Sequence, residues 1–262
     1  MTDQNQLIYR ELQANLYDIN YKSKNYKLES EFILNKINNF SKKDSKEINM
    51  LDIGCGTGTH ISFLSSFFAN LVGVDSSSDM IYLAKQKYNQ VKNIDFLCSN
   101  ISDLKSKFLP DYFDAVTLLY SVSGYLGPID NLIDKIKFLS SIMNENAVLI
   151  LDYWDIKLLN YEYEIMREKV LEFKDFQYKK ISIGKIDPSN TFVDSNISWE
   201  RIGSNTKWAE THRVYCYNNN ELIKKLQNIN FQVVLDVRDG DLGTPIIDRK
   251  SRWLVAVKLK TK

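Results

Sequence analysis

Three glycines at alternating positions, Gly54, Gly56 and Gly58, directly follow a short apolar run at residues 50–53. A short apolar run that ends at glycines is typical of a buried β-strand. Apolar residues between positions 61 and 68 recur at helical spacing, so a helix is expected after the glycines. Glycine allows a sharp turn and close approach of a ligand to the main chain, and a helix N-terminus favours an anionic group. The stretch therefore predicts an α/β fold whose ligand has an anionic end.

An acidic residue ends the next predicted strand. The apolar run at residues 71–74 is followed by Asp75, about 20 residues after the glycine loop. In a nucleotide-binding βαβ unit, a carboxylate at this point accepts hydrogen bonds from both ribose hydroxyls. The glycine spacing is G-x-G-x-G rather than the dinucleotide pattern G-x-G-x-x-G, and Asp52 precedes the first glycine by two residues. The pattern alone fits a dinucleotide or S-adenosylmethionine (SAM).

The block at residues 51–58 resembles motif I of the class I SAM-dependent methyltransferases, and Asp75 is similar to the acid that binds the ribose in that family. The resemblance implies an α/β fold with a doubly wound, mostly parallel seven-stranded sheet, SAM as cofactor and S-adenosylhomocysteine as product. Asn100 matches the residue that binds the adenine amino group, although it also fits an ordinary turn. The cofactor-binding residues predicted in this way are Asp52, Gly54, Cys55, Gly56, Asp75, Ser76, Met80, Asn100, Ile101, Leu119, Tyr120 and Tyr26.

The hydrophobic pattern divides the chain into four parts. Residues 1–45 have helical periodicity and are expected to form a helical N-terminal lid, and residues 46–154 alternate strands and helices as a SAM-binding core. Residues 155–217 contain alternating segments between turn signals, which predict an antiparallel β insertion of three or four strands over the acceptor cleft. Residues 218–262 are expected to add a helix and two strands that complete the core.

Periodicity also predicts the bounds of single elements. The helix after the glycine loop is expected to carry Phe67 and Phe68 on its apolar face. A later helix is expected to extend to Met143, before a strand at residues 147–153. The tyrosine-rich polar segment 17–26 fits either a linker with half-buried tyrosines or a lid over the cofactor.

Charge and composition limit the partners. The chain has 34 Lys and Arg against 33 Asp and Glu, a balance that gives no field to attract nucleic acid or an anionic membrane. No apolar run approaches the length of a membrane span, about 18 residues, and no apolar signal-peptide region follows the polar N-terminus. Cys55, Cys98 and Cys216 are odd in number and lack metal-ligand spacing, so a reducing cytoplasm and no bound metal are expected. A homodimer is compatible with the sequence.

The chain has only two histidines. His60 follows the glycine loop and is predicted to be structural or to lie beside the cofactor's carboxylate. His212 lies in the predicted insertion, where it fits either a histidine bonded across two strands or a base that faces the cleft. Glu210 stands two residues earlier, so both side chains would lie on one face of a strand. A hydroxyl acceptor usually needs such a base, whereas a neutral amine attacks without one.

A narrower resemblance concerns the acceptor. Residues 121–126, the Tyr17-Asp18 pair and residues 251–257 resemble bacterial N-methyltransferases that act on nucleotide-linked amino sugars, with relatives in surface-polysaccharide gene sets. Some members carry histidine where this chain has Tyr125, and Arg252 also fits a surface ion pair. The resemblance implies that the acceptor pocket is lined by Tyr17, Ser123, Tyr125 and Arg252. With the histidine pair, the catalytic candidates are His212, Tyr17, Tyr125, Glu210 and Arg252.

These observations predict a SAM-dependent methyltransferase that acts on an amino or hydroxyl group of a small polar acceptor. The expected acceptor is a nucleotide-linked sugar or another activated precursor of a surface polysaccharide. An O-methyltransferase acting on a non-sugar phosphorylated or nucleotide-linked capsule precursor stays open, and so does a SAM-binding protein without catalysis. The glycine spacing disfavours a nicotinamide-dependent dehydrogenase, and an insertion that narrows the cleft disfavours a protein methyltransferase.

Overall fold

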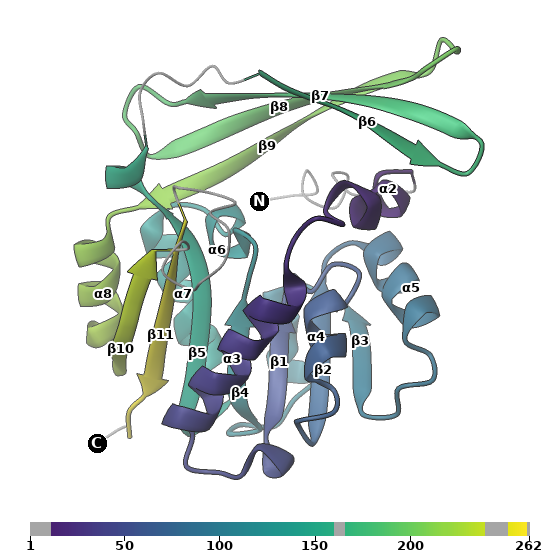
Figure 1. Cartoon of the computed structure of the whole chain (residues 1–262). Helices are drawn as coiled ribbons and strands as arrows, with labels where there is room; N and C mark the ends of the chain where they lie inside the picture. The colour runs from purple at the N-terminus through teal and green to yellow at the C-terminus, as the bar shows by residue number, and fades with distance from the viewer. Residues whose placement is uncertain (1–11, 160–165, 239–250, 261–262) are drawn as a thin grey trace.

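A seven-stranded sheet forms the centre of the protein in the computed structural model, which describes residues 12–159, 166–238 and 251–260. Its strands are β1 (Asn49–Ile53), β2 (Asn70–Asp75), β3 (Ile94–Cys98), β4 (Phe113–Leu118), β5 (Met143–Asp155), β10 (Phe231–Arg238) and β11 (Ser251–Lys258). The order across the sheet is β3-β2-β1-β4-β5-β11-β10, with β1–β5 parallel and β11 antiparallel to both of its neighbours (Figure 1). The carboxyl ends of the five parallel strands therefore share one edge, where α/β sheets bind ligands.

Helices cover both faces of this sheet (Figure 1). They are α3 (Tyr26–Phe40), α4 (Thr59–Leu64), α5 (Ser78–Lys87), α7 (Ile129–Ser140) and α8 (Asn219–Asn228). One buried cluster, which includes Phe113 and Leu132, joins α7 and α8 to the sheet. A second cluster, which includes Ile33 and Ile61, joins α3, α4 and α5 to the other face. Every residue of β4 is buried because helices cover the sheet on both sides.

Four antiparallel strands form a second unit, called the cover below. They are β6 (Met166–Phe173), β7 (Phe176–Ile186), β8 (Phe192–Arg201) and β9 (Lys207–Tyr217), and neighbours in the chain pair with each other. The end of β9 pairs in parallel with the end of β5 at Trp154 and Asp155. The cover thus stands at the edge of the main sheet where the parallel strands end, as Figure 1 shows.

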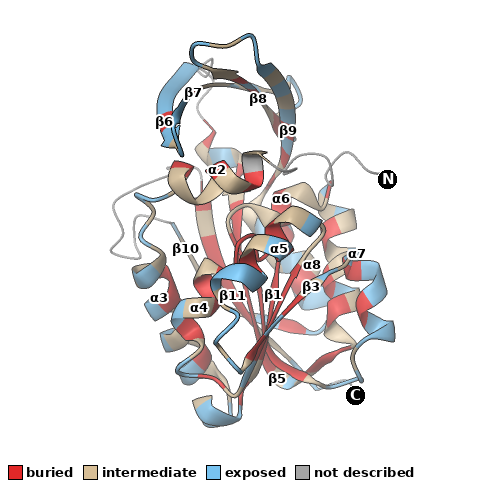
Figure 2. Ribbon diagram, turned by 90° about the vertical axis from the view of Figure 1, so that its right-hand side faces the viewer, coloured by how far each residue is buried: buried red, intermediate tan, exposed pale blue. Residues whose placement is uncertain are grey.

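The N-terminal helix α2 (Leu12–Asn20) lies under the concave face of the cover (Figure 2). Leu16 is fully buried there and packs in one cluster with Tyr178 of β7, Ile197 and Trp199 of β8. Successive strand residues point to opposite faces, so the concave face carries every second residue counted from these three. The chain just after α2 is therefore held between the cover and the core.

The predicted doubly wound, mostly parallel seven-stranded sheet is confirmed, and the described part of the insertion contains four antiparallel strands. Part of the predicted first helix, residues 6–11, lies outside the described residues. Within residues 12–159, 166–238 and 251–260, every helix is too short or too polar to span a bilayer.

Two elements end elsewhere than predicted, and serine side chains account for both. The helix after the glycine loop stops at Leu64 because Ser62 Oγ and Ser65 Oγ donate to carbonyls of the same helix, at 2.7 and 2.8 Å. Phe67 consequently lies outside it, 42 % exposed. Serine hydroxyls likewise bond the last carbonyls of α7, which ends at Ser140, so Met143 begins β5 instead of ending the helix.

Candidate active site

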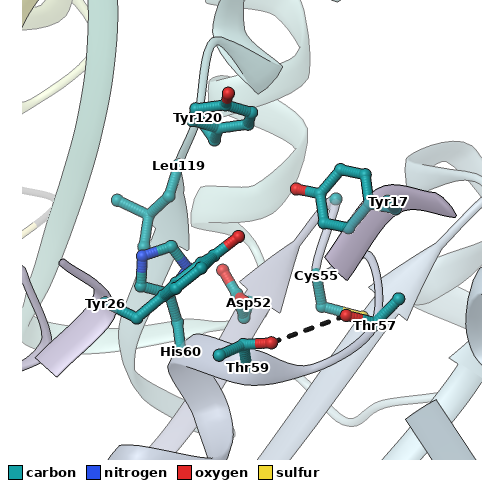
Figure 3. A pocket seen from close by; sticks show the side chains of 10 residues that line it. Tyr17, Tyr26, Asp52, Cys55, Thr57, Thr59, His60, Leu119 and Tyr120 are labelled. Atoms are coloured by element: carbon teal, nitrogen blue, oxygen red, sulfur yellow. Dashed lines mark hydrogen bonds between the residues drawn. The ribbon is translucent and has the colours of Figure 1, made fainter. Parts of the chain in front are cut away.

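A pocket lies at the carboxyl ends of β1 and β4, between the glycine loop and three tyrosines, Tyr17 on α2, Tyr26 at the start of α3 and Tyr120 after β4 (Figure 3). Its lining consists of Tyr17, Tyr26, Asp52, Gly54, Cys55, Thr57, Thr59, His60, Leu119 and Tyr120. All of these except Thr57, Thr59 and His60 belong to the cofactor-binding or catalytic residues predicted from the sequence. The pocket brings Tyr17, expected at the acceptor, together with the predicted cofactor residues.

Left-handed backbone conformations shape the glycine loop. Gly54 and Gly56 have φ values of 70° and 54°, which other residues rarely adopt. A Cβ on Gly54 would lie 2.3 Å from Val122 Cγ2, because α6 (Val122–Tyr125) packs directly on the loop. At Gly56 the nearest atoms belong to the ring of Tyr17, 3.8 Å from the position of a Cβ. Tyr17 of α2 thus lies against the main chain of the glycine loop.

Asp75 is bonded to this loop at the end of β2. Its Oδ2 accepts from the Gly56 N–H at 3.0 Å and its Oδ1 from the Ser77 N–H at 2.8 Å. Burial raises the pKa of Asp75, and these two bonds oppose the rise. A carboxylate has about four lone-pair sites, so both oxygens can still accept further bonds, as ribose binding requires. Ser76 lies beside it in the chain, and Met80 is buried on α5.

Asp52 is a second buried carboxylate at the same edge, 2 % exposed. Thr117 Oγ1 donates to its Oδ1 at 2.6 Å. Burial raises the pKa of Asp52 to about 7; the bond from Thr117 opposes the rise and the charge of Asp75 adds to it. Two acids beside one pocket favour a ligand that carries positive charge.

Tyrosine rings surround the side of the pocket that faces the lid. The ring of Tyr21 lies edge-on to those of Tyr17 and Tyr120, with both centroid distances at 4.9 Å. The ammonium of Lys24 lies 4.5 Å from the ring centroid of Tyr120 and 5.1 Å from that of Tyr26. The faces of aromatic rings attract cations. In the structure, the cation that these two rings attract is the ammonium of Lys24.

Lys24 belongs to a buried ion cluster with Glu29 and His60. Its Nζ donates to Glu29 Oε1 at 2.7 Å, and His60 Nε2 is 2.7 Å from Glu29 Oε2. Burial lowers the pKa of His60 despite the opposing effect of Glu29. Burial by itself would raise the pKa of Glu29, but His60 and Lys24 outweigh it and lower that pKa. At neutral pH the cluster therefore presents a neutral imidazole and a paired carboxylate; sequence analysis missed both Lys24 and Glu29.

Asp18 connects the lid to the glycine loop and to α5. Its Oδ1 accepts from Thr57 Oγ1 at 2.6 Å, and its Oδ2 accepts from Lys87 Nζ at 2.8 Å. Lys87 Nζ also lies 3.2 Å from Thr57 Oγ1. Of the two interpretations of segment 17–26, these contacts favour a lid.

Three side chains connect the cover to α6, through one hydrogen bond between Tyr125 and His212 and one charge contact between His212 and Glu210. Tyr125 Oη and His212 Nδ1 are 2.8 Å apart, and His212 Nε2 is 3.4 Å from Glu210 Oε2. Trp199 Nε1 donates to Glu210 Oε1 at 3.2 Å. Glu210 and His212 share one face of β9, as their spacing predicts. With the Nε2 proton directed at Glu210, Nδ1 accepts from the Tyr125 hydroxyl.

Tyr21 lies between this series and the pocket. Its ring contacts that of Tyr120 in the pocket. Burial raises the pKa of Tyr21; a bond with Tyr120 lowers it, and the negative charge of Glu210 raises it further. The negative charge of Glu210 therefore acts on Tyr21, which in turn contacts the pocket residue Tyr120.

The turn after β4 is strained and is held by Asp152 of β5. Tyr120 and Ser121 both have positive φ, 62° and 63°, a conformation that costs about 1–3 kcal/mol per residue. The Ser121 N–H donates to both carboxylate oxygens of Asp152, at 2.8 and 3.0 Å, and Ser123 Oγ donates to the Asp152 carbonyl at 2.6 Å. Asp152 thus positions Tyr120 and the start of α6. Its only signal in the sequence is an acid within an apolar strand.

Several predicted residues lie outside the pocket lining, among them Arg252, Asn100 and Ile101. Arg252 forms a two-pronged ion pair with Asp236 of β10, its Nε and Nη2 each 2.9 Å from a carboxylate oxygen. This pairing agrees with the ion-pair alternative considered for Arg252. Asn100 is exposed after β3, and Ile101 is buried in the cluster beneath α7. Their roles at the cofactor or acceptor stay predictions.

Residues 50–137 match a family model described as a methyltransferase domain. This chain carries a methyltransferase domain. The sugar N-methyltransferase of Streptoalloteichus sp. has the same fold, with a TM-score of 0.77, 17 % sequence identity and 99 % coverage of both chains. The predicted fold is confirmed, and the match over residues 50–137 agrees with the predicted methyltransferase rather than with a nicotinamide-dependent dehydrogenase.

Two curated relatives differ in the acceptor that their names state. The dTDP-3-amino-3,6-dideoxy-alpha-D-glucopyranose N,N-dimethyltransferase of Streptomyces fradiae is 27 % identical over 146 residues, which are 54 % of this chain and 53 % of that protein. The ubiquinone biosynthesis O-methyltransferase of Pelagibacter ubique is 26 % identical over 196 residues, 74 % of this chain and 70 % of that protein. The match to the first relative therefore spans about half of its length.

Proposed function

We propose that this chain transfers a methyl group from SAM to the amino group of a nucleotide-linked sugar. The observation that carries the proposal is the Tyr125–His212–Glu210 series, which continues from the cofactor pocket onto the concave face of the cover. The Streptomyces fradiae relative, named for a dTDP-linked amino sugar, supports this acceptor class. The role in surface-polysaccharide synthesis stays a prediction from the resemblance.

The pocket residues fit SAM through charge and shape. Asp75 would accept the ribose hydroxyls, the main chain at Gly56 would face the methionyl end, and the ring of Tyr120 would lie near the sulfur. When bound, SAM supplies a methyl group on a positively charged sulfur that leaves as a neutral thioether. The chain therefore needs to orient a nucleophile in a dry site rather than to stabilise a developing anion.

Removal of a proton is the chemical task left to this chain. A sugar amine is partly protonated at neutral pH, and it carries one proton too many after each methyl transfer. Tyr125 can take that proton on its oxygen while its own proton passes to His212 Nδ1, 2.8 Å away. Glu210 stabilises the imidazolium that results, because its carboxylate lies 3.4 Å from Nε2. His212 is 5 % exposed, which keeps bulk water away from the transfer.

A hydroxyl acceptor is the second candidate, because the same series is what a hydroxyl nucleophile would require. A hydroxyl holds its proton far more tightly than an ammonium does, so its attack depends on a base at every pH near neutrality. The O-methyltransferase relative from Pelagibacter ubique supports this alternative.

The deciding experiment measures S-adenosylhomocysteine release with a panel of nucleotide-linked amino sugars and their hydroxyl counterparts. The wild type is compared with His212→Asn and with Thr211→Val, whose side chain lies on the opposite face of β9 and bonds Asn196 at 2.8 Å. For an amine acceptor, His212→Asn should lose about 10-fold in kcat at pH 7 and recover near pH 9, where the amine is already neutral. Thr211→Val should match the wild type.

Three results would change the conclusion. Turnover on hydroxyl acceptors that falls at least about 100-fold in His212→Asn at all pH values would establish the second candidate. If His212→Asn turned over an amino sugar at pH 7 as fast as the wild type, the Tyr125–His212–Glu210 series would have no part in the mechanism. SAM binding without release of product from any acceptor would support a binding protein without catalysis.

A further inference from the structure

Two lysines stand side by side on the concave face of the cover. Lys169 of β6 and Lys180 of β7 are directly opposed in the strand register. Lys180 stands two residues after Tyr178, which packs against α2, so both share the concave face. Like charges directly opposed across two strands are destabilising. An anionic ligand would offset the repulsion between two lysines that face inward in this way.

The surroundings of Lys180 differ from those of its neighbour in the chain. Lys179, on the outer face, forms an ion pair with Glu168 at 2.9 Å. Within the described residues no carboxylate lies at ion-pair distance from Lys180, whose ammonium instead lies 5.2 Å from the ring centroid of Trp199 and 5.7 Å from that of Tyr21. Lys169 Nζ has a backbone carbonyl at 3.4 Å. Lys180 is thus a half-buried cation that faces the site without a fixed counter-ion.

We propose that Lys180, with Lys169 beside it, binds the diphosphate of a nucleotide-linked acceptor. Lys180 touches Tyr21, and Tyr21 lies next to both Glu210 and the cofactor pocket. A diphosphate held here would leave the attached sugar beside Tyr125 and His212, while Trp199 offers an aromatic face next to the cation. The inference rests on the proposed function for its choice of acceptor, but the anion site itself can be tested without turnover.

Electrostatics around Lys180 predict how binding depends on pH. The ionisable groups that face it are Lys169 from β6, Glu210 from β9 and Tyr21, which directly follows α2. Burial lowers the pKa of Lys180 to about 8; Glu210 opposes this change and Lys169 adds to it. A bound diphosphate favours the ammonium form, so binding takes up part of a proton. Affinity should therefore be highest below pH 8 and fall as the pH rises through 8.

The test uses calorimetric titration of the SAM-saturated full chain with UDP-glucose and with inorganic pyrophosphate. UDP-glucose has no reactive amine, and its charge is constant between about pH 6 and 8.5, so any pH dependence in this range comes from the protein. At pH 7, Lys180→Gln should weaken both ligands about 10-fold, as expected for loss of one charged contact. The matched control is Lys179→Gln, on the outer face of the same strand, which should bind both like the wild type. SAM affinity, measured in parallel, should be equal in the wild type, Lys180→Gln and Lys179→Gln, and equal values would show that the variants are folded.

Two outcomes of the titration would overturn the site. One is equal affinity of Lys180→Gln and the wild type for both ligands; the other is wild-type binding of UDP-glucose no tighter than that of uridine. Failure of the proposed function looks different: diphosphate binding would still depend on Lys180, but no amino sugar would release S-adenosylhomocysteine. The reverse result is also possible: Lys180→Gln could methylate an amino sugar with the kcat and KM of the wild type. That result would support the proposed function and contradict the proposed diphosphate site.

Discussion

The proposed cofactor side and the proposed acceptor side of this protein are built in different ways. On the cofactor side, the functional groups stand in the loops at the ends of β1, β2 and β4, and hydrogen bonds from main-chain N–H groups, such as that of Gly56 to the Asp75 carboxylate, hold them. On the acceptor side, side chains from separate units meet: Tyr125 and His212, joined at 2.8 Å, are 87 residues apart in the chain. The first arrangement follows from local geometry, whereas the second exists only after the cover has folded over the core.

This difference implies that the two sides can be disturbed separately. The cover is joined to the main sheet by two residue pairs between β5 and β9, and by packing of α6 on β9. Its concave face also rests on α2 through the cluster around Leu16. Substitutions on that face should therefore change the binding and turnover of the acceptor, and they should leave the binding of SAM intact. The following predictions test this separation.

The largest effect is expected at Asp75. Asp75→Ala removes both acceptors for the ribose and the bond that holds Gly56, so SAM affinity should fall about 1,000-fold, as loss of two charged hydrogen bonds implies. Titration calorimetry with SAM measures this, with Asp95→Ala on the exposed side of β3 as control. Glu210→Gln should leave SAM affinity within about 2-fold. A loss in Glu210→Gln as large as in Asp75→Ala would show that the two sides are one unit.

A pH-dependent change in stability is expected from Asp52. Its pKa in the folded protein is raised to about 7, so its stabilising contribution is complete below the unfolded value near 4 and is lost as the pH rises through 7. Between pH 5 and pH 8 the wild type should lose about 3 kcal/mol of unfolding free energy relative to Asp52→Asn. Urea unfolding of both proteins across this range measures the difference. A constant difference would mean that Asp52 stays ionised throughout.

The strained turn at Tyr120 and Ser121 lies between the cofactor side and the acceptor side. Substitution of Asp152 tests how much this turn contributes to stability and to both sides. Asp152→Ala leaves the Ser121 N–H without its carboxylate, so unfolding free energy should fall by about 2 kcal/mol. Because Tyr120 and Tyr125 flank this turn, both SAM affinity and acceptor turnover should weaken together. Asp134→Ala, an exposed position on α7, is the control for stability. If only acceptor turnover changed, the turn would belong to the acceptor side alone.

The smallest effect is expected where the lid meets α5. Asp18→Asn weakens the ion pair with Lys87, a partly exposed contact of about 0.5–1 kcal/mol. SAM should consequently dissociate about 3-fold faster, as measured by stopped-flow displacement, with little change in acceptor KM. Glu31→Gln on α3, which breaks a longer 3.9 Å pair with Lys27, provides the comparison. An unchanged dissociation rate in Asp18→Asn would argue against a lid.

Sequence patterns predicted the cofactor side more fully than the acceptor side. The glycine loop, Asp52 and Leu119 line the pocket, because a strand followed by glycines leaves little choice of backbone. Spacing also placed Glu210 and His212 on one face, since strand periodicity is local. Sequence reasoning missed Lys24 and Asp152, whose partners could be known only from the folded chain.

The sequence by itself determined the order of strands and helices, the glycine loop and the acid after β2, because each depends on residues next to one another in the chain. Only the tertiary structure decided which side chains meet. Asp152 reaches Ser121 across 31 residues, and Lys180 approaches Tyr21 only because the cover encloses α2. Contacts of this kind are set by the packing of whole units, and no local preference of the backbone encodes them.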